Sequence, residues 1–426
     1  MKRIAQEFRR IGSSSLARNA GWAFLGKGLS IVFQGVYFVL LARLLGAQQY
    51  GIFVGTVAMV STLSPYSTFG SAPVFLRYVS RDPQNFALYW GNVLVTTAVL
   101  GTLLVGLLTW GVPLLAHSYS WTLVLCVAIG ECFCLQLTYA AGLVFQTFEK
   151  MRVTAALNLL VNCLRSLLAW TMLWRMHHAT AGQWAVAALS ASSIATVIAL
   201  ILVSREHGKT AFSLSLLRRR IGEGFVFAVS GTTGSVYNDI DKAMLGHYGM
   251  NTANGIYSMA YRTVDVATMP VLSIHAAAFP RFFRKGQDGV GSTGAYAWKI
   301  LKRTMPMGLV LAAALFLIAP VIPRLVGSSF NESVSALRWL CLLPLFRSFH
   351  LSAGDALTGA GHQRFRLGSQ GAAALFNFGI NLFLIPRYGW HGAAWSSLAT
   401  DGMLAVCNWT IFMAVYRRDK IRRVLQ

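Results

Sequence analysis

Charged side chains interrupt several long apolar stretches of this chain, at places where helix packing alone has no use for them. Lys27 and Arg262 are basic residues of this kind, and Asp241 and Asp265 are acidic ones. Basic groups in apolar surroundings can hold an anion through charge-assisted hydrogen bonds. Carboxylates in such surroundings can take up a proton or coordinate a cation. The chemistry that we expect is therefore the binding of a charged ligand.

The spacing of the polar residues places several of them on common helical faces. One stripe, with intervals of three and four residues, comprises Lys27, Ser30, Gln34 and Tyr37. A comparable stripe comprises Ser230, Thr233, Tyr237 and Asp241. Residues three or four apart share one face of a helix, so each stripe predicts a polar face towards a wet interior. Arg262 and Asp265 are three apart and can pair.

The elements that must position these residues are membrane-spanning helices. The 426 residues are 55% hydrophobic and only 12% charged, with a mean hydropathy of +0.54, whereas about 25% of the residues in a soluble domain are charged. A helix needs about 20 apolar residues to cross a bilayer. Twelve such runs lie at about 20–44, 50–73, 91–116, 121–144, 154–174, 183–203, 221–245, 254–276, 300–322, 334–353, 367–386 and 391–416. The sequence therefore predicts an all-α polytopic membrane protein with about 12 transmembrane helices.

The net charge of +23 is explained by membrane topology. With the N-terminus in the cytoplasm, twelve crossings place most Lys and Arg residues in the cytoplasmic loops, including Arg218–Arg220 and the basic segment 417–423. This is the positive-inside pattern, and it predicts that both termini are cytoplasmic. The basic excess then contacts anionic lipid on the cytoplasmic side, and we expect no nucleic-acid partner.

The two halves of the chain resemble each other. Residues 37–46 align with 237–246 without a gap, so that Leu45-Gly46 meets Leu245-Gly246. After four inserted residues, YGIF at 50–53 meets NGIY at 254–257. The duplication predicts two six-helix lobes, residues 1–210 and 211–426, related by a pseudo-twofold axis along the membrane normal. Transporters use such repeats to rock two similar lobes about a shared site.

Several motifs that suggest other chemistry fail on their context. GVGSTG at 289–294 has the spacing of a dinucleotide fingerprint, but no strand precedes it. It falls in the longest expected loop, the basic cytoplasmic segment 281–299. His177 and His178 have no further candidate ligands nearby, and no nucleophile–base arrangement stands out. We expect no catalytic residues, no metal, no cofactor and no enzymatic activity.

Four segments resemble a known transporter family. They are LLARLLGAQQYGIF (40–53), DKAMLGHYGMNTANGIYSMAYR (241–262), GAGHQRFR (359–366) and NLFLIPRYGWHGAAWSSLATD (381–401). Together they resemble the polysaccharide-transport branch of the multidrug/oligosaccharidyl-lipid/polysaccharide (MOP) exporter superfamily. The resemblance spans nearly the whole chain and implies a MATE-like fold with two six-helix bundles around a cationic lumen.

The resemblance implies a Wzx-type flippase. Such proteins translocate undecaprenyl-pyrophosphate-linked oligosaccharide repeat units across the bacterial inner membrane by alternating access, for O-antigen, capsule or exopolysaccharide assembly. The implied partners are the lipid-linked glycan itself and, in the same pathway, a polysaccharide polymerase and chain-length machinery. The sequence identifies neither the sugars nor the coupling ion.

The expected substrate contacts combine this resemblance with the charge pattern. Cationic side chains expected to hold the pyrophosphate are Lys27, Arg43, Arg77, Lys242 and Arg262. Asp241 and Asp265 are expected either to couple the cycle to protons or Na⁺ or to balance the charge of the lumen. Arg338 and Arg347 lie within reach of the ends of their helix. Each can equally well snorkel to the lipid headgroups.

Other functions fit parts of the pattern. Within the same superfamily, a cation-coupled drug exporter favours an acidic or apolar cavity, and a lipid II flippase typically carries two further helices. A membrane polysaccharide polymerase or glycosyltransferase generally presents a large periplasmic loop, whereas the outer loops expected here are short. A non-transporting scaffold leaves the two polar stripes without a purpose.

Overall fold

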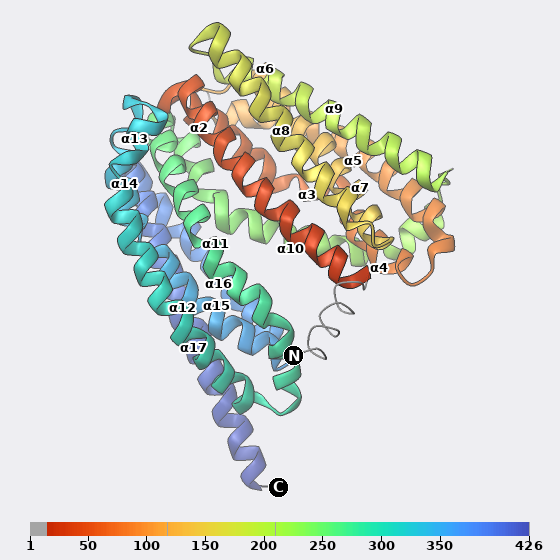
Figure 1. Ribbon diagram of the computed structural model, residues 1–426, viewed down its shortest axis with the longest axis vertical. Coiled ribbons are helices and arrows are strands. Elements are labelled where there is room, and N and C mark those ends of the chain that lie inside the picture. Colours follow the sequence, from red (N-terminus) through yellow and green to blue (C-terminus); the bar gives the residue numbers. More distant parts are fainter. Residues whose placement is uncertain (1–14, 117, 209, 426) are drawn as a thin grey trace, which may run out of the picture. The chain divides into compact units, whose positions relative to one another are not determined.

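The computed structural model of the protein describes residues 15–425 apart from 117 and 209, with side chains described for Gly26 and from Gly28 to Ile421. All of its regular secondary structure in these residues is helical (Figure 1). The chain forms two compact units. The first consists of the chain up to Leu45 together with Thr56–Ser235, and the second consists of Gly46–Gly55 together with the chain from Val236 onward.

The first unit contains the N-terminal helices and the beginning of α10. Its elements are α2 (Ser15–Leu63) outside Gly46–Gly55, α3 (Pro65–Thr68), α4 (Ser71–Val79), η1 (Pro83–Asn85), α5 (Phe86–Leu115), α6 (Trp121–Ile129), the π-helical η2 (Gly130–Leu135), α7 (Gln136–Thr147), α8 (Met151–Met176), α9 (Ala181–His207) and the start of α10 (Leu214–His247).

The second unit contains the remainder of α10 and the C-terminal helices. Its further elements are α11 (Asn251–Gln287), α12 (Val290–Ile318), α13 (Val321–Val326), η3 (Ser328–Phe330), α14 (Ser333–Leu340), α15 (Leu343–Gly359), α16 (Gln363–Tyr388) and α17 (Trp390–Leu425). Compared with the predicted halves, the two units exchange short segments of α2 and α10. The predicted lobe boundary at residue 210 stays a prediction.

Nine helical segments among the described residues are long and apolar enough to cross a membrane. The predicted runs 20–44 and 50–73 both begin within α2, which consists of two helices that meet at a kink at Gly46. The runs 221–245 and 334–353 are helical in α10 and in α14 with α15. The all-α polytopic class is therefore confirmed. The number of twelve crossings stays a prediction.

The segment 281–299, expected to be a loop, is almost entirely helical. Helix α11 continues to Gln287 and α12 begins at Val290, so only Asp288 and Gly289 lie between them. The expectation of a loop was wrong because hydropathy marks the part of a helix that suits hydrocarbon, whereas backbone hydrogen bonding continues beyond it.

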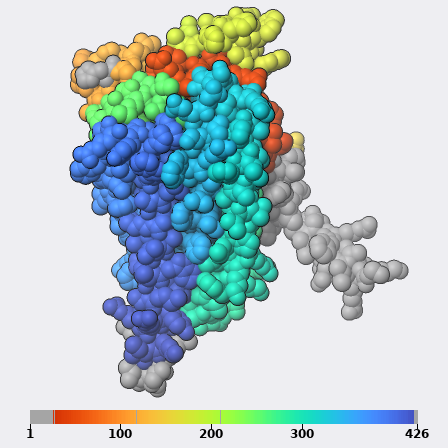
Figure 2. All heavy atoms as spheres, turned by 90° about the vertical axis from the view of Figure 1, so that its left-hand side faces the viewer, coloured from red at the N-terminus to blue at the C-terminus, as the bar shows by residue number. Residues whose placement is uncertain are grey.

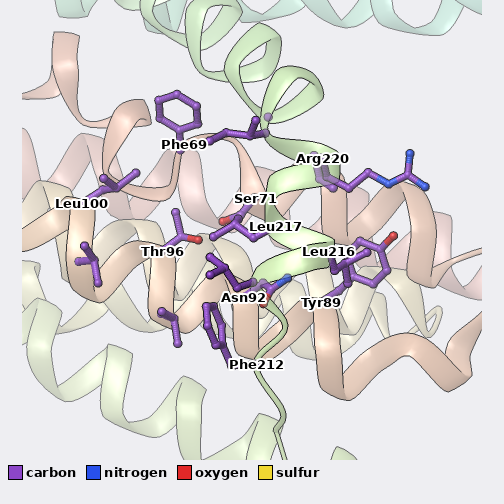
Figure 3. Close-up of a pocket in the computed structure, with 16 residues that line it drawn as sticks. Phe69, Ser71, Tyr89, Asn92, Thr96, Leu100, Phe212, Leu216, Leu217 and Arg220 are labelled. Atoms are coloured by element: carbon purple, nitrogen blue, oxygen red, sulfur yellow. The ribbon is translucent and has the colours of Figure 1, made fainter.

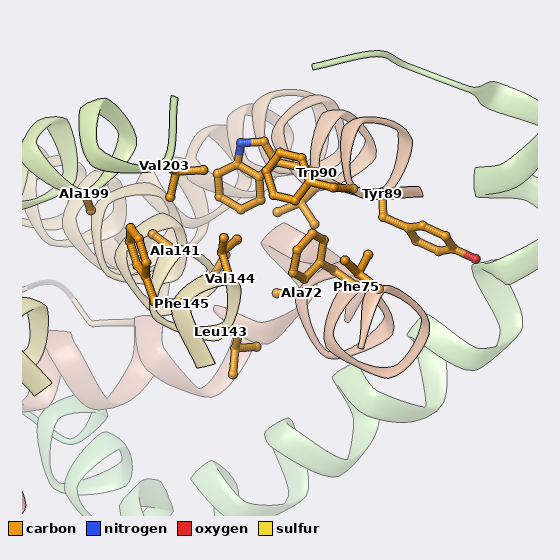
Figure 4. Close-up of a cluster of buried hydrophobic side chains, with 14 of the residues drawn as sticks. Ala72, Phe75, Tyr89, Trp90, Ala141, Leu143, Val144, Phe145, Ala199 and Val203 are labelled. Carbon is orange, nitrogen blue, oxygen red and sulfur yellow. The ribbon is translucent and has the colours of Figure 1, made fainter. Parts of the chain in front are cut away.

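The first unit is held together by an aromatic and aliphatic core between α4, α5, α7 and α9 (Figure 4). Phe75 of α4 lies edge-on to Phe86 and Trp90 of α5, with ring centroids 5.7 and 6.0 Å apart. Edge-to-face pairs at such distances add about 0.5–1.5 kcal/mol beyond area burial. Small residues of α7 and α9, Ala141 and Ala199, allow these helices to approach the cluster.

The outer surface of the second unit is rich in apolar side chains. Figure 2 shows α12, α14 and α17 side by side on one face of this unit. Large exposed residues on these helices include Leu309, Val310 and Leu317 of α12, Trp339 of α14, and Val406 of α17. A soluble protein would bury such a surface. In a membrane protein the same residues face lipid tails, so their exposure carries no hydrophobic free-energy cost.

Two glycines bring α2 and α11 into backbone contact within the second unit. A Cβ on Gly51 would lie 1.8 Å from the carbonyl oxygen of Asn251, and a Cβ on Gly255 would lie 2.0 Å from that of Ala47. Asn254 reinforces the contact by donating to the carbonyl of Gly51 at 3.2 Å. Just before it, Gly46 (φ 65, ψ 172) kinks α2 in a conformation that only glycine adopts easily. Gly51 and Gly255 belong to the aligned segments YGIF and NGIY.

We predict that Gly255→Ala destabilises the protein, because its methyl group would overlap the backbone of α2. Overpacking of this kind costs about 1–3 kcal/mol. The matched control is Gly368→Ala in α16, where a Cβ meets nothing within 4 Å and alanine is the better helix former. Heating followed by size-exclusion chromatography in detergent should show less surviving protein for Gly255→Ala only. Equal survival of both variants would contradict the predicted contact.

Candidate functional site

The second unit contains an open polar cavity of about 390 Å³ between α10, α11 and α15. Its lining residues are Tyr237, Asn238, Asp239, Lys242, Tyr261, Arg262, Asp265, Leu272, Arg347, His350 and Leu351. Three of these side chains are cationic and two are carboxylates. Because an ionisable group within a membrane is costly unless it pairs or faces water, so dense a cluster indicates a functional site.

Lys242 is buried in the wall of this cavity. Its ammonium group donates to the carboxylate of Asp239 at 2.6 Å and to the backbone carbonyl of Asn238 at 3.0 Å. The same nitrogen lies 4.7 Å from the centre of the Tyr261 ring, a distance suited to a cation–π contact. Only 3% of the lysine side chain is exposed, against 27% of the aspartate. The carboxylate is therefore the partner that water or a ligand reaches first.

Arg347 of α15 connects the walls of the cavity. Its guanidinium donates to Asp265 at 2.9 Å and to the Tyr261 hydroxyl at 2.9 Å. Its Nε lies 3.8 Å from a carboxylate oxygen of Asp401 in α17. The planar fork of arginine suits several acceptors at once. One side chain thus ties α15 to α11 and α17.

Asp401 lies behind the cavity and is almost fully buried. The hydroxyl of Tyr237 donates to it, and the imidazole Nε2 of His350 lies 3.8 Å away. With Arg347, these groups surround a carboxylate that would otherwise be costly in an apolar interior. Tyr237 belongs to the polar stripe expected from the sequence, so the stripe does reach the cavity.

Asp241 is not among the residues that line the cavity, and its hydrogen-bond partners are different ones. It accepts hydrogen bonds from the Tyr257 hydroxyl, from Ser397 at 3.2 Å and from the backbone amide of Lys242 at 2.8 Å. These partners hold α10 to α11 and α17. The two acidic residues singled out from the sequence therefore occupy different environments, because Asp265 lines the cavity whereas Asp241 is buried away from it.

A further buried charge cluster lies in the same unit. Asp355 of α15 accepts from Arg366 of α16 at 2.9 Å, and its other oxygen lies 2.8 Å from Nδ1 of His275 in α11. Arg366 also donates to the hydroxyl of Thr358 at 3.1 Å. Because Asp355 has a partner at each oxygen, this cluster is explained by helix packing.

The first unit has its own polar cavity, of about 450 Å³, lined mainly by α2, α7 and α8. Polar residues in its wall are Ser30, Gln34, Thr138, Tyr139, Thr154, Asn158, Asn162 and Arg165. Asn158, Asn162 and Arg165 are spaced by four and three residues, which places them on one face of α8. Arg165 donates to Ser192 of α9 at 2.9 Å. Amides and hydroxyls dominate here, whereas charges dominate in the second unit.

The structure brings together only part of the predicted site. Lys242, Arg262 and Asp265 line one cavity. Arg43 is exposed on α2, and Arg77 pairs with Glu223 at 3.2 Å within the first unit. The side chain of Lys27 lies outside the described residues, although its backbone is helical. Substrate roles for these residues stay predictions.

The sequence patterns do not identify Arg347, His350 or Asp401 as site residues. Arg347 lies near the end of its apolar run, where an arginine can equally well reach the lipid headgroups. A signal was present, since His350 follows Arg347 by three residues and so shares its helical face. Arg338, weighed equally with Arg347, is exposed, with its guanidinium 4.8 Å from the ring centre of Phe316. The position of a residue in its run therefore did not separate a site residue from a surface one.

Comparisons with known proteins agree on a transporter fold. A family model described as polysaccharide biosynthesis protein matches residues 16–285, more than half of the chain. Lipid II flippase MurJ in an inward closed conformation superposes with a TM-score of 0.72 at 13% identity, covering 92% of this chain and 86% of that one. No curated protein matches in sequence.

Transporters of the MOP superfamily superpose over an equally large part of the chain. An inward-facing multidrug resistance MATE family transporter gives a TM-score of 0.68 at 15% identity, covering 93% of this chain and 99% of that one. A MOP superfamily transporter from Pyrococcus furiosus, described as having a binding pocket of reverse polarity, gives 0.61 at 13% identity, covering 94% and 96%. At these identities the matches show the fold, and they confirm the MATE-like architecture.

We predict that Arg347→Met destabilises the protein strongly, because it leaves Asp265 and Asp401 without their guanidinium. Removing one partner of a buried ion pair costs about 3–5 kcal/mol. Asp265→Asn should cost less, since that carboxylate is 32% exposed. The double variant Arg347→Met/Asp401→Asn should recover part of the loss by removing a stranded charge. Resistance to heating in detergent measures all three, and an unchanged Arg347→Met variant would show that the network is not stabilising.

Proposed function

Because the chain belongs to the polysaccharide biosynthesis protein family, we propose that it is a flippase for lipid-linked glycans. In this proposal it moves undecaprenyl-pyrophosphate-linked oligosaccharide repeat units from the cytoplasmic to the periplasmic leaflet of a bacterial inner membrane. The products would serve O-antigen, capsule or exopolysaccharide assembly. The proposal rests on the family match and on the chemistry of the two cavities.

The cationic cavity of the second unit is the observation that carries the proposal. A pyrophosphate presents several anionic oxygens, and Lys242, Arg262 and Arg347 offer ammonium and guanidinium donors around a space of about 390 Å³. Charge-assisted hydrogen bonds of this type are the strong ones. The polyprenyl tail needs no such site because it is soluble in the bilayer.

Lys242 and Arg347 each have a carboxylate partner, which suggests how binding is made reversible. Asp239 holds Lys242 and Asp265 holds Arg347, and both carboxylates are about 30% exposed, at 27% and 32%. An entering pyrophosphate competes with these carboxylates for the same donors. When the substrate leaves, the ion pairs reform, so neither cation is left unpaired in the empty protein. Asp265 can then balance charge or take part in ion coupling, as its position in the cavity allows.

The polar cavity of the first unit suits the glycan part of the substrate. Asn158, Asn162 and Gln34 supply amides that donate and accept hydrogen bonds, as sugar hydroxyls require. Tyr139 adds an aromatic ring, and Arg165 adds one positive charge. In our proposal this cavity contacts sugars of the substrate, and alternating access carries the substrate across the membrane.

Lys27, Arg43 and Arg77 are proposed to assist the entry of the pyrophosphate. Asp241, held by Tyr257 and Ser397, is proposed to balance the charge of Lys242. Export of organic cations is the second candidate, because Asp239 and Asp265 are the partly exposed carboxylates of the cavity.

We predict that Arg262→Gln and Lys242→Gln impair transport of the lipid-linked glycan. A lost charge-assisted hydrogen bond costs about 1.5–3 kcal/mol, which corresponds to roughly 10- to 100-fold weaker binding. Cells lacking the protein are complemented with each variant, and periplasmic glycan is scored with an externally acting glycan-modifying probe. Arg338→Gln is the control, since Arg338 is exposed and does not line the cavity.

The outcomes separate the candidate functions. Glycan trapped on the cytoplasmic side in the null strain, released by wild type and the control but poorly by the two cavity variants, supports the flippase. Normal glycan exposure in the null strain, without a redundant flippase, contradicts it. Loss of resistance to organic cations in that same strain would then favour drug export, and loss of lipid II transport would favour a lipid II flippase.

A further inference from the structure

A second kind of cavity, almost wholly apolar, lies in the first unit between α4, α5 and the start of α10. It holds about 300 Å³ (Figure 3). Apolar side chains that line it are Phe69, Val74, Val95, Val99, Leu100, Phe212, Leu214, Leu216, Leu217 and Ile221. Neither polar cavity includes these residues, so the proposed glycan path does not use it.

Backbone contacts at both ends of this cleft fix its shape. At one end the amide of Ala211 donates to the carbonyl of Ala87 at 3.0 Å, and Ser213 donates to the side chain of Asn92 at 3.0 Å. At the other end Gly70 and Gly224 pack so closely that a Cβ on Gly70 would lie 2.1 Å from the carbonyl oxygen of Gly224. The start of α10 is thus fastened to the rest of the unit on both sides of an apolar space.

One edge of the cleft carries a cluster of positive charge. Arg220 lines the cleft, and in Figure 3 its side chain extends away from the apolar lining. Arg220 and Arg77 share one carboxylate, that of Glu223, at 3.0 and 3.2 Å. The hydroxyl of Tyr78 donates to Glu223 at 2.7 Å, and this hydrogen bond raises the pKa of Tyr78, which therefore stays neutral. The cluster carries one net positive charge.

The neighbouring arginines extend this positive region. Arg218 and Arg219 are exposed at the beginning of α10, and neither has an acidic partner within 4.0 Å among the described residues. By the positive-inside pattern this edge belongs to the cytoplasmic side, where the bilayer surface is anionic. An apolar slot beside a cationic edge has the same polarity order as a phospholipid, whose acyl chains are followed by a phosphate.

We propose that this cleft binds an anionic phospholipid of the cytoplasmic leaflet, with one acyl chain in the apolar slot and the phosphate on Arg77 and Arg220. The single negative charge of a phosphodiester matches the net charge of the Arg77, Arg220 and Glu223 cluster. Arg218 and Arg219 favour lipids whose headgroup adds no positive charge, such as phosphatidylglycerol. Because the start of α10 forms one wall, the bound lipid fastens this segment to α4 and α5.

The test measures lipid binding to the full-length protein. Protein purified in detergent and stripped of lipid is titrated with phosphatidylglycerol, phosphatidylcholine or undecaprenyl phosphate, and bound lipid is counted by native mass spectrometry. Phosphatidylglycerol should bind about tenfold more tightly than phosphatidylcholine. Arg220→Gln should remove most of this preference, whereas Arg418→Gln, at an exposed arginine of α17, should leave it unchanged.

A second variant tests the acyl slot without altering the charges. Leu100→Trp replaces an aliphatic side chain with a bulkier indole ring, which fills part of the cleft. It should reduce phosphatidylglycerol binding at least tenfold while the arginine cluster remains intact. Equal binding of phosphatidylglycerol and phosphatidylcholine, unchanged binding by Leu100→Trp, or tighter binding of undecaprenyl phosphate than of phosphatidylglycerol would each overturn the proposal. The last result would instead identify the cleft as a binding site for the polyprenyl carrier.

Discussion

The cost of a charge among apolar helices is the constraint on which the rest of the second unit depends. Arg347 meets it by reaching Asp265, Tyr261 and Asp401 at once. Each contact comes from a different neighbouring helix or a different turn, so satisfying one guanidinium also sets the spacing of α11, α15 and α17. Asp265, the partner of Arg347, and Asp239, the partner of Lys242, remain 32% and 27% exposed, so water can reach both carboxylates.

The two units solve the problem of polar residues in different ways. In the second unit, ion pairs such as Lys242 with Asp239 neutralise buried cations. In the first unit, Asn158 and Asn162 need no counter-ion, because a neutral amide can exchange its hydrogen bonds with water or with hydroxyl groups. This difference in polarity is the basis for assigning the pyrophosphate and the sugars to separate cavities.

Much of the fold was predictable because hydropathy reports directly on burial in lipid. The twelve apolar runs predicted helices, and of the polar stripe Tyr237 lines the cavity whereas Asp241 is buried away from it. Hydropathy did not predict that α11 and α12 would run on through segment 281–299, since nothing in an apolar count records helix beyond the bilayer. Nor did it identify Arg347, whose role depends on partners from distant helices, Asp265 and Asp401.

Sequence resemblance contributed what physical patterns could not. The aligned segments 50–53 and 254–257 indicated a duplicated chain, and family resemblance supplied the glycan carrier as the candidate substrate. The apolar cleft of the first unit was invisible at that level, because Leu100 and Leu217 look like any other lipid-facing residues until the start of α10 is seen against α5.

The contact between Gly51 and Gly255 constrains how the two copies of the repeat can diverge. After a duplication, equivalent positions are normally free to change one at a time, and each copy drifts on its own. Here the equivalent glycines face each other's backbone, so a side chain gained in either copy intrudes on its twin. This shared contact therefore preserves part of the resemblance between the two halves.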